Sequence, residues 1–304
     1  MAALLLLRDG VGIRYAGIAR KDALGLRRLR RSLPGVPIDA VPDLTNADVR
    51  ARVLAAGGDM LVSWYWVKNI PAPIREAYAR GSINVHPSLL PRHRGADPFF
   101  WAIDCGDAET GVTAHRLAAE YDTGAIVAQT RLSIDPSWNA WRLAKRLDRP
   151  SLALLRDVVG RVARGETLSE SPQNEAEATA APAPNEDALE IDWTQSTAAI
   201  ERRVRAAAPW PGAYMFFGDE ALTLTRVRPS HEVVRALVPG EGWIGKDAQG
   251  AAVARVRTGD GALDLLEARF ETGDEENDQQ NQTQGDVVNQ AELADAMANG
   301  QGLA

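Results

Sequence analysis

The first hundred residues alternate between short apolar strands and helical runs, and this alternation constrains the fold more than any other feature of the chain. Strands that alternate with helices at this interval are typical of a parallel sheet covered by helices. We therefore predict an α/β fold with a doubly wound, mostly parallel, Rossmann-like sheet. The expected elements are strand 13–20, helix 23–33, strand 36–41, helix 45–56, strand 59–64, helix 73–79 and strand 82–85, followed by strands 111–117 and 125–134, which we expect to pair as a hairpin.

A change of composition divides the chain after this first domain. Residues 165–188 are rich in Glu, Ala, Pro, Thr and Asn, which is typical of an extended linker. Several short strands punctuated by glycine follow and predict a small antiparallel β-barrel. Beyond them the chain is acidic and rich in Asn and Gln, which favours a mobile tail. The predicted parts are a first domain at 1–164, a linker at 165–188, a barrel domain at 189–271 and a tail at 272–304.

Composition limits the kinds of function that this chain can have. The formal net charge of −7 gives no general attraction to the phosphates of a nucleic acid. Four arginines between residues 27 and 31 form a basic cluster, which is more typical of a solvated helix face. No apolar run is long enough for a membrane span. The single cysteine, Cys105, excludes an internal disulfide and fits a cytoplasmic protein, and with only four histidines a multi-ligand zinc site is not expected.

Asn84 and His86 lie two residues apart at the end of the strand that precedes Pro87. Side chains two apart on a strand point to the same side of the sheet, and in an open α/β sheet ligands bind at the carboxyl ends of the strands. A carboxamide and an imidazole in that position can act as a catalytic pair. They can equally be structural, with Asn84 capping a turn and His86 bound to a buried carbonyl group. The spacing alone gives the two interpretations equal weight.

An ordered series of short motifs begins at this pair and continues past the predicted linker. The motifs are Asn84-Val85-His86-Pro87-Ser88-Leu89-Leu90-Pro91, Arg94-Gly95, Gly106-Asp107, Thr110-Gly111-Val112-Thr113, Asp122-Thr123-Gly124, IDW at 191–193 and PWPGAY at 209–214. With these motifs the chain resembles the formyltransferase family that uses 10-formyltetrahydrofolate, and the similarity covers residues 13–270. The resemblance implies the formyltransferase fold for the first domain and the OB-like β-barrel of methionyl-tRNA formyltransferases for the second.

Two branches of this family share further details with the chain. The stretches TGVTAHRLAAEYDTGAIVAQTRLSI and APWPGAY, together with residues 63–70, are most similar to the domain that formylates UDP-4-amino-4-deoxy-L-arabinose. The stretch PSLLPRHRGA is just as similar to the formyl-folate hydrolase module of formyltetrahydrofolate dehydrogenase. These details leave the branch open.

The chemistry of the family implies roles for three polar residues. A neutral amine attacks the formyl carbon, and the oxyanion that develops needs hydrogen-bond donors. Asn84 is expected to be one donor and a protonated His86 the other, with His86 also moving protons between the two nitrogens. Asp122 is expected to lie beside His86 and to raise its pKa by charge, although an aspartate before a Thr-Gly pair can also simply stabilise a turn. His93 is expected in an exposed loop and His115 in a strand, neither with a chemical role.

The resemblance also implies where the folate is held. One loop is expected to lie against it and two further segments to hold the pterin ring through backbone groups. The loop is Ser88, Leu89, Leu90 and Pro91, and the segments are Lys68, Asn69 and Ile70, and Ala118, Ala119, Glu120 and Tyr121. Trp64 and Trp66 could line the same pocket, although aromatic residues at a strand end more often belong to the core. No metal is expected.

Two features differ from the family pattern. Residues 4–10 resemble the end of the family's first helix, so that the first strand would be missing from the sheet, unless residues 3–7 form that strand themselves. The basic Gly-Arg-rich insertion that methionyl-tRNA formyltransferases carry after the second strand has no counterpart here, which argues against a tRNA acceptor.

The combined expectation is an enzyme of one-carbon metabolism. It would be an N-formyltransferase that moves a formyl group from 10-formyltetrahydrofolate to the amine of a small acceptor such as an amino-sugar nucleotide. The alternatives are formylation of methionyl-tRNA, hydrolysis of formyltetrahydrofolate with water in place of the amine, and a folate-binding protein without catalysis. The sequence names neither the acceptor nor the oligomeric state.

Overall fold

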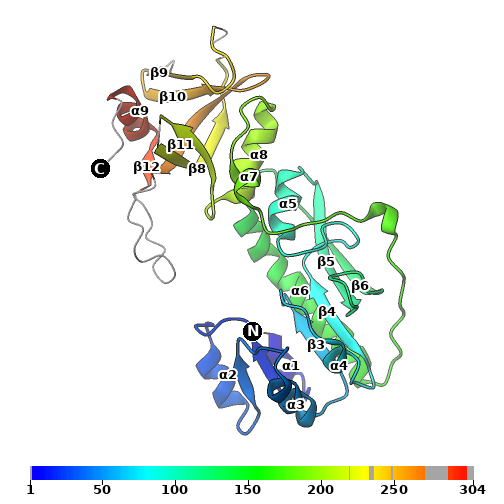
Figure 1. Ribbon diagram of the computed structural model, residues 1–304. Helices are drawn as coiled ribbons and strands as arrows, with labels where there is room; N and C mark the ends of the chain where they lie inside the picture. Colours follow the sequence, from blue (N-terminus) through cyan, green and yellow to red (C-terminus); the bar gives the residue numbers. More distant parts are fainter. Residues whose placement is uncertain (1, 219, 233–235, 248, 271–286, 300–304) are drawn as a thin grey trace. The chain divides into compact units, whose positions relative to one another are not determined.

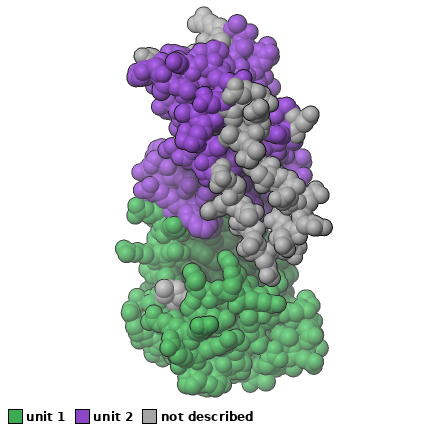
Figure 2. Space-filling view, turned by 90° about the vertical axis from the view of Figure 1, so that its left-hand side faces the viewer, with its two compact units in different colours: residues 1–98, 109–134, 144–182 green, residues 99–108, 135–143, 183–304 purple. Residues whose placement is uncertain are grey.

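The structure, a computed structural model, describes residues 2–218, 220–232, 236–247, 249–270 and 287–299. The chain forms two compact units, which are green and purple in Figure 2. The first unit comprises Met1–Pro98, Glu109–Ile134 and Ala144–Pro182, and the second comprises Phe99–Ala108, Asp135–Leu143 and Ala183–Ala304. Within the described ranges, no helix is both long and apolar enough to cross a membrane.

Strands and helices alternate along the first unit as the sequence predicts (Figure 1). Strands β1 and β2 pair in parallel, whereas β3, β4, β5 and β6 form a second sheet in that order. In this sheet β3 and β4 are parallel, and the predicted β5–β6 hairpin is antiparallel. The elements up to the end of α6 are α1 (Ala2–Arg8), β1 (Ala16–Ile18), α2 (Leu26–Ser32), β2 (Ile38–Ala40), α3 (Ala47–Ala56), β3 (Leu61–Trp64), α4 (Ala72–Arg75), β4 (Ser82–His86), α5 (Pro98–Asp104), β5 (Glu109–Arg116), β6 (Ile126–Ser133) and α6 (Ala140–Ala163).

The α/β fold is therefore confirmed, with one difference from the single sheet that was expected. Among the described strands, no pairing joins β1 or β2 to β3, so the strands of the first unit form two sheets. The larger sheet is parallel only between β3 and β4, because β5 runs antiparallel to β4.

Helix α1 decides between the two interpretations of the N-terminal residues. Residues 2–8 are helical, so the helical interpretation is confirmed and the alternative of a strand at 3–7 is wrong. The physical reason is the spacing of the leucines. Leu4 and Leu7 lie three residues apart on one face of the helix, and both pack against the cluster that contains Leu29 and Leu33.

Strand β4 is buried along its whole length, and this burial fixes which way its side chains point. Ile83 and Val85 have an exposed fraction of 0%, which stabilises the fold by about 3–6 kcal/mol for the pair relative to leaving them in water. Because successive side chains on a strand point to opposite faces, Asn84 and His86 share the other face. Helix α6 lies beside this sheet (Figure 1). A hydrogen bond joins the two, since Trp64 Nε1 donates to Ser151 Oγ at 3.3 Å.

Residues 171–181, which we call the strap, lie within the segment predicted as a linker but belong to the first unit, where they pack against β6 and the loop after β4. Ser171 forms an antiparallel bridge with Ile126, and Ala180 forms a parallel bridge with Arg94. The Arg94 N–H donates to the Thr179 carbonyl oxygen at 2.8 Å. The extended chain of the strap is therefore held by backbone hydrogen bonds to Ile126 and to Arg94.

Side chains of the loop after β4 fasten the strap further. Arg94 donates from Nε and Nη2 to Gln173 Oε1, at 3.0 and 2.7 Å, and pairs with Glu175 at 2.8 Å. Gly95 permits the close approach, because its φ is 129° and a Cβ there would lie 2.6 Å from the Ala181 carbonyl oxygen. A side chain at position 95 would therefore push the strap away.

The second unit is built on the expected antiparallel sheet, which confirms the fold class of this part. Its path is β7-β8-β11-β10-β9, with β12 paired to β11. Ser196 caps helix α8 (Thr197–Ala207), because its side chain accepts from the Ala199 N–H. Ile200 and Val204 are buried on one face of this helix. The elements are α7 (Glu186–Leu189), α8 (Thr197–Ala207), β7 (Ala213–Phe217), β8 (Glu220–Pro229), β9 (Gly242–Lys246), β10 (Ala252–Arg257), β11 (Ala262–Phe270), β12 (Val288–Asn289) and α9 (Gln290–Asn299), with a 3₁₀ turn (Glu175–Glu177) in the strap.

Part of the predicted tail at 272–304 departs from the expectation. Residues 288–299 form β12 and α9, while residues 271–286 and 300–304 lie outside the described residues. Leu293 and Met297, four residues apart, are buried on one face of α9. The acidic and amide-rich composition of this stretch concealed that apolar spacing.

Candidate active site

The register between β4 and β5 assembles the centre of the site. Asn84 and His86 lie on one face of β4, and the antiparallel register sets His115 directly opposite Asn84. Residues opposite each other in an antiparallel pair project to the same face. Asn84, His86 and His115 are only 6%, 4% and 1% exposed. Three polar side chains therefore meet on a buried patch of the sheet.

Asp122 reaches the same patch from the loop that joins β5 to β6. Its φ is 56°, a left-handed conformation that Asp and Asn adopt more readily than most residues. Gln173 of the strap fixes this loop, since its Nε2 donates to the carbonyl oxygens of Asp122 and Gly124 at 2.7 and 2.8 Å. The Gly95 N–H donates to Asp122 Oδ2 at 3.0 Å. These bonds turn the carboxylate back toward β4.

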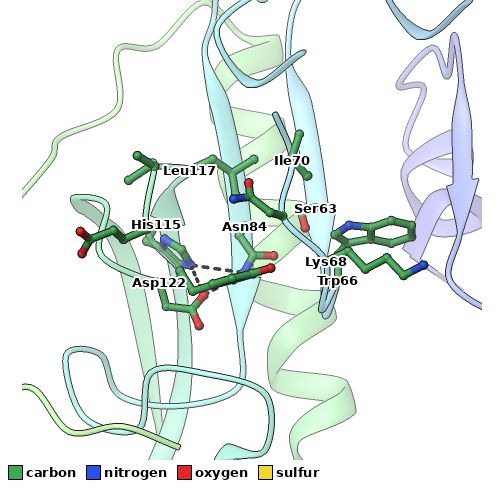
Figure 3. A pocket seen from close by; sticks show the side chains of 13 residues that line it. Ser63, Trp66, Lys68, Ile70, Asn84, His115, Leu117 and Asp122 are labelled. Atoms are coloured by element: carbon green, nitrogen blue, oxygen red, sulfur yellow. Dashed lines mark hydrogen bonds and ion pairs between the residues drawn. The ribbon is translucent and has the colours of Figure 1, made fainter. Parts of the chain in front are cut away.

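The Asp122 carboxylate then joins the three side chains of the sheet. Oδ2 lies 3.4 Å from His86 Nδ1, and Oδ1 lies 3.3 Å from His115 Nε2. Asn84 Nδ2 donates to Oδ1 at 3.4 Å and lies 3.3 Å from His115 Nε2. Figure 3 shows Asn84, His115 and Asp122 converging in this way.

Each histidine of the cluster lies between the carboxylate and a backbone carbonyl group. His86 Nε2 is 2.8 Å from the His93 carbonyl oxygen, and His115 Nδ1 is 2.8 Å from the Arg116 carbonyl oxygen. A carbonyl oxygen can only accept, so each of these nitrogens carries a proton. The second nitrogen of each ring faces Asp122.

Burial controls the charge of this cluster. It lowers the pKa of His86 by disfavouring the imidazolium, and the opposing attraction of Asp122 is the smaller effect. The prediction that Asp122 lies beside His86 and raises its pKa by charge is confirmed. Burial outweighs the carboxylate, however, so the pKa of His86 is lowered overall and the expected protonated ring is disfavoured. Burial alone would raise the pKa of Asp122, but the hydrogen bond to His115 and the proximity of His86 hold it below its usual range.

A pocket opens beside the cluster (Figure 3). Its walls are the segments after β3 and β5, and they include seven residues predicted to hold the folate: Lys68, Asn69, Ile70, Ala118, Ala119, Glu120 and Tyr121. Asn84, His115 and Asp122 line it as well, together with Ser63, Trp66 and Leu117. The predicted loop of Ser88, Leu89, Leu90 and Pro91 is not among the residues that line this pocket.

Two histidines differ from the sequence-based expectation. His93 is 2% exposed, so its expected place in an exposed loop is wrong; the strap contacts it, and Thr179 Oγ1 accepts from its N–H at 2.8 Å. His115 was given no chemical role, yet it contacts both Asn84 and Asp122. The hairpin pattern around His115 contained a signal, but using it requires the register of β5 against β4.

Trp64 and Trp66 have separate places. Trp64 donates a hydrogen bond to Ser151 of α6, whereas Trp66 lines the pocket.

Across the residues that the structure describes, no group of three or more His, Cys, Asp or Glu side chains is arranged to hold a metal ion.

Comparisons with known proteins agree with this architecture. The model of the formyl transferase family matches residues 21–159, and the model of its C-terminal domain matches residues 185–283. A methionyl-tRNA formyltransferase of Treponema pallidum is 35% identical over 227 residues, which cover 75% of this chain and 70% of that protein.

Two solved structures share the fold at low sequence identity. HypX from Aquifex aeolicus in complex with tetrahydrofolic acid is 19% identical with a TM-score of 0.64, and the match covers 95% of this chain but only 48% of HypX. WlaRD, a sugar 3N-formyl transferase, is 15% identical with a TM-score of 0.60, and the match covers 88% of this chain and 92% of WlaRD. The fold agrees with that of these structures, and the family models and the relative at 35% identity show that this chain belongs to the formyltransferase family.

Proposed function

We propose that this protein transfers a formyl group from 10-formyltetrahydrofolate to the amine of a small acceptor, such as an amino-sugar nucleotide. The observation that carries the proposal is the pocket whose wall includes Asn84, His115 and Asp122. It places a buried amide donor and a carboxylate–imidazole cluster beside a cavity, as a formyl-transfer reaction requires.

Two buried atoms of the pocket fit the polar edge of a pterin ring. Trp66 Nε1, a donor, and Asn84 Oδ1, an acceptor, have no hydrogen-bond partner among the described residues. Buried polar groups in proteins are nearly always paired, so a ligand that offers both an acceptor and a donor would satisfy them. The pterin ring of a folate offers both.

The residues of the cluster have distinct tasks in the proposed reaction. Bound 10-formyltetrahydrofolate supplies an electrophilic formyl carbon whose oxygen gains negative charge as the amine attacks. The Asn84 amide donates to that oxygen. Asp122 and the neutral His86 accept the proton that the attacking nitrogen loses and return one to the folate nitrogen as its bond to the formyl carbon breaks.

Formylation of methionyl-tRNA is the second candidate. The relative at 35% identity is a methionyl-tRNA formyltransferase, and the four arginines of α2, Arg27, Arg28, Arg30 and Arg31, are all exposed. Against this candidate stand the net charge of −7 and the lack of a basic insertion after the second strand. The small acceptor therefore remains our first choice.

One experiment tests both candidates. The purified protein is incubated with 10-formyltetrahydrofolate in three parallel reactions, which contain amino-sugar nucleotides, methionyl-tRNA or no amine. The tetrahydrofolate released in each reaction is followed by its absorbance. We expect turnover with an amino-sugar nucleotide. Turnover with the tRNA alone would favour the second candidate, formate release without an amine would indicate a hydrolase, and no turnover in any reaction would contradict the proposal.

Two variants connect this activity to the site. Asn84→Ala and His86→Ala should each lower kcat/KM by about 100-fold or more, while circular dichroism shows an intact fold. His231→Ala, which changes an exposed histidine far along the sequence, is the control and should keep the wild-type rate. Equal turnover in all three variants would refute the assigned roles.

A further inference from the structure

We propose that His115 is a positioning residue for Asn84, and that the protonation of its Nε2 decides whether the Asn84 amide is held by the protein or is free to bind the ligand. The inference rests on the proposed formyl transfer and adds to it a residue with no assigned role. A neutral His115 would accept from Asn84 Nδ2. A protonated His115 would donate to Asp122 and leave an Asn84 N–H for the formyl oxygen.

The hydrogen bonds of His115 determine which of its nitrogens can titrate. Nδ1 lies 2.8 Å from the Arg116 carbonyl oxygen and must be its donor. Nε2 lies 3.3 Å from Asn84 Nδ2, which can only donate, and 3.3 Å from Asp122 Oδ1, which accepts when ionised. A lone pair on Nε2 therefore suits Asn84 and a proton suits Asp122, so the two states of the ring favour different partners.

The Asn84 amide has no spare donor while the ring is neutral. Its Nδ2 carries two hydrogens, and the two acceptors within reach are Asp122 Oδ1 at 3.4 Å and His115 Nε2 at 3.3 Å. Protonation of His115 Nε2 removes the lone pair that accepts from Asn84, because the new Nε2–H then faces an Nδ2–H of Asn84. Because Asn84 is 6% exposed and lines the pocket, the released N–H can find a new partner only there.

The surroundings make His115 responsive to the chemistry next to it. Asp122 is the nearest charge, and the His86 ring stands edge-on with its centroid 6.4 Å away. Lys68 and Glu120 line the same pocket. The two imidazoles share one carboxylate, so the protonation of one ring changes the free energy of protonating the other.

The decisive measurement follows the Asn84 side chain itself. In nitrogen-15 NMR spectra of the folate-free protein between pH 5 and 9, the Asn84 NH₂ signals, identified by their loss in Asn84→Ala, should shift with the same midpoint as the His115 ring. In His115→Gln that shift should disappear, because glutamine is neutral throughout. The proposal would be overturned if the His115 ring does not titrate in this range, or if the chemical shifts of the Asn84 signals do not change as it titrates.

Kinetics separate positioning from a merely structural role. In the wild type, one limb of the kcat/KM profile should fall as pH rises and His115 loses its proton. His115→Gln, whose amide can donate to Asp122, should lack this limb and keep a rate within about 5-fold of the wild-type maximum, whereas His115→Leu should lose about 100-fold. A wild-type pH profile in both variants would contradict the inference.

Failure of the proposed function gives a different pattern. If the wild type forms no product with any amine, formyl transfer is refuted, and the NMR titration still decides whether His115 controls Asn84. His231→Gln is the control for both measurements, because it replaces an exposed histidine and should change neither.

Discussion

Two largely buried aspartates, one in each unit of the molecule, have different kinds of partner. Asp122 in the first unit faces two imidazoles at 3.3–3.4 Å. Asp264 on β11 accepts from Arg255 Nε at 2.7 Å and from Arg228 Nη2 at 3.0 Å, since the strand register sets these arginines on either side of it. One carboxylate has partners that can lose their charge, and the other has partners that cannot.

This difference separates a chemical site from a structural one. Burial alone would raise the pKa of Asp264, and the hydrogen bonds of Arg255 and Arg228 hold it below its usual range. The guanidinium groups stay charged at every accessible pH, so Asp264 acts as a permanent cross-strand link. The partners of Asp122 are imidazoles, which exist in both charged and neutral forms, so its hydrogen bonds can change during a reaction. Burial and a lowered carboxyl pKa are common to both sites; the partner distinguishes them.

The largest expected effect comes from removing the charge of each carboxylate in turn. Asp122→Asn should lower kcat/KM by about 1,000-fold, because the histidines lose their common charged partner, while Asn tolerates the φ of 56°. Asp264→Asn should leave kcat/KM per folded molecule within about 2-fold, because the pocket lies entirely in the first unit. Steady-state kinetics corrected for the folded fraction checks this. Equal losses would erase the distinction between the two aspartates.

The next effect concerns stability and reverses the order of the two sites. Arg255→Met should destabilise the second unit by about 3 kcal/mol, because it leaves Asp264 with one arginine in place of two. The matched control is Arg226→Met, which removes the exposed pair with Glu267 and should cost under about 1 kcal/mol. Denaturant melts followed by hydrogen exchange of β10 and β11 measure both. Similar costs would mean that the buried pair contributes no more than a surface one.

The smallest effect is the response to acid. The folded-state pKa of His86 is lowered below its unfolded value of about 6.5, so below that pH the unfolded state takes up a proton that the folded state does not, and the first unit loses up to about 1.4 kcal/mol per pH unit. Asp264, whose pKa is lowered, keeps its contribution above about pH 3.9 and loses it as the pH falls through its folded-state pKa.

Hydrogen exchange at pH 7, 6 and 5, corrected for the intrinsic exchange rate, tests this difference. Amides of β4 should lose protection in this range and amides of β11 should not. His86→Gln should flatten the response of β4. Unchanged protection of the β4 amides from pH 7 to pH 5 would show that His86 contributes nothing to the acid sensitivity.

The sequence predicts the local parts of the fold well and the long-range parts poorly. Periodicity and turn residues are local signals, so the alternation of strands and helices and the shared face of Asn84 and His86 follow from them. The separation of β1 and β2 from the larger sheet depends on which strands meet, and α9 depends on an apolar pair within polar residues. Neither the strand pairing nor helix α9 can be predicted from the composition of these segments.

The site shows the same division. Asn84, His86 and Asp122 were identified from motifs, but His115 lies 31 residues from Asn84 and meets it only through the register of β5 on β4. A shift of one residue would turn His115 to the opposite face. His93 is buried and donates its N–H to Thr179 of the strap, 86 residues further along the chain, which no local pattern around His93 could indicate.

The strap also has a consequence for the time at which the site can form during synthesis. When the ribosome has just added Arg164, it has made β1 to β6 and helix α6, yet Gln173 does not exist, and the carbonyl groups of Asp122 and Gly124 lack the side chain that holds them. The carboxylate is therefore set in place only after the sheet beneath it. A nascent chain, or a fragment cut at the apparent end of the first domain, would have its strands complete and its reactive centre unfinished.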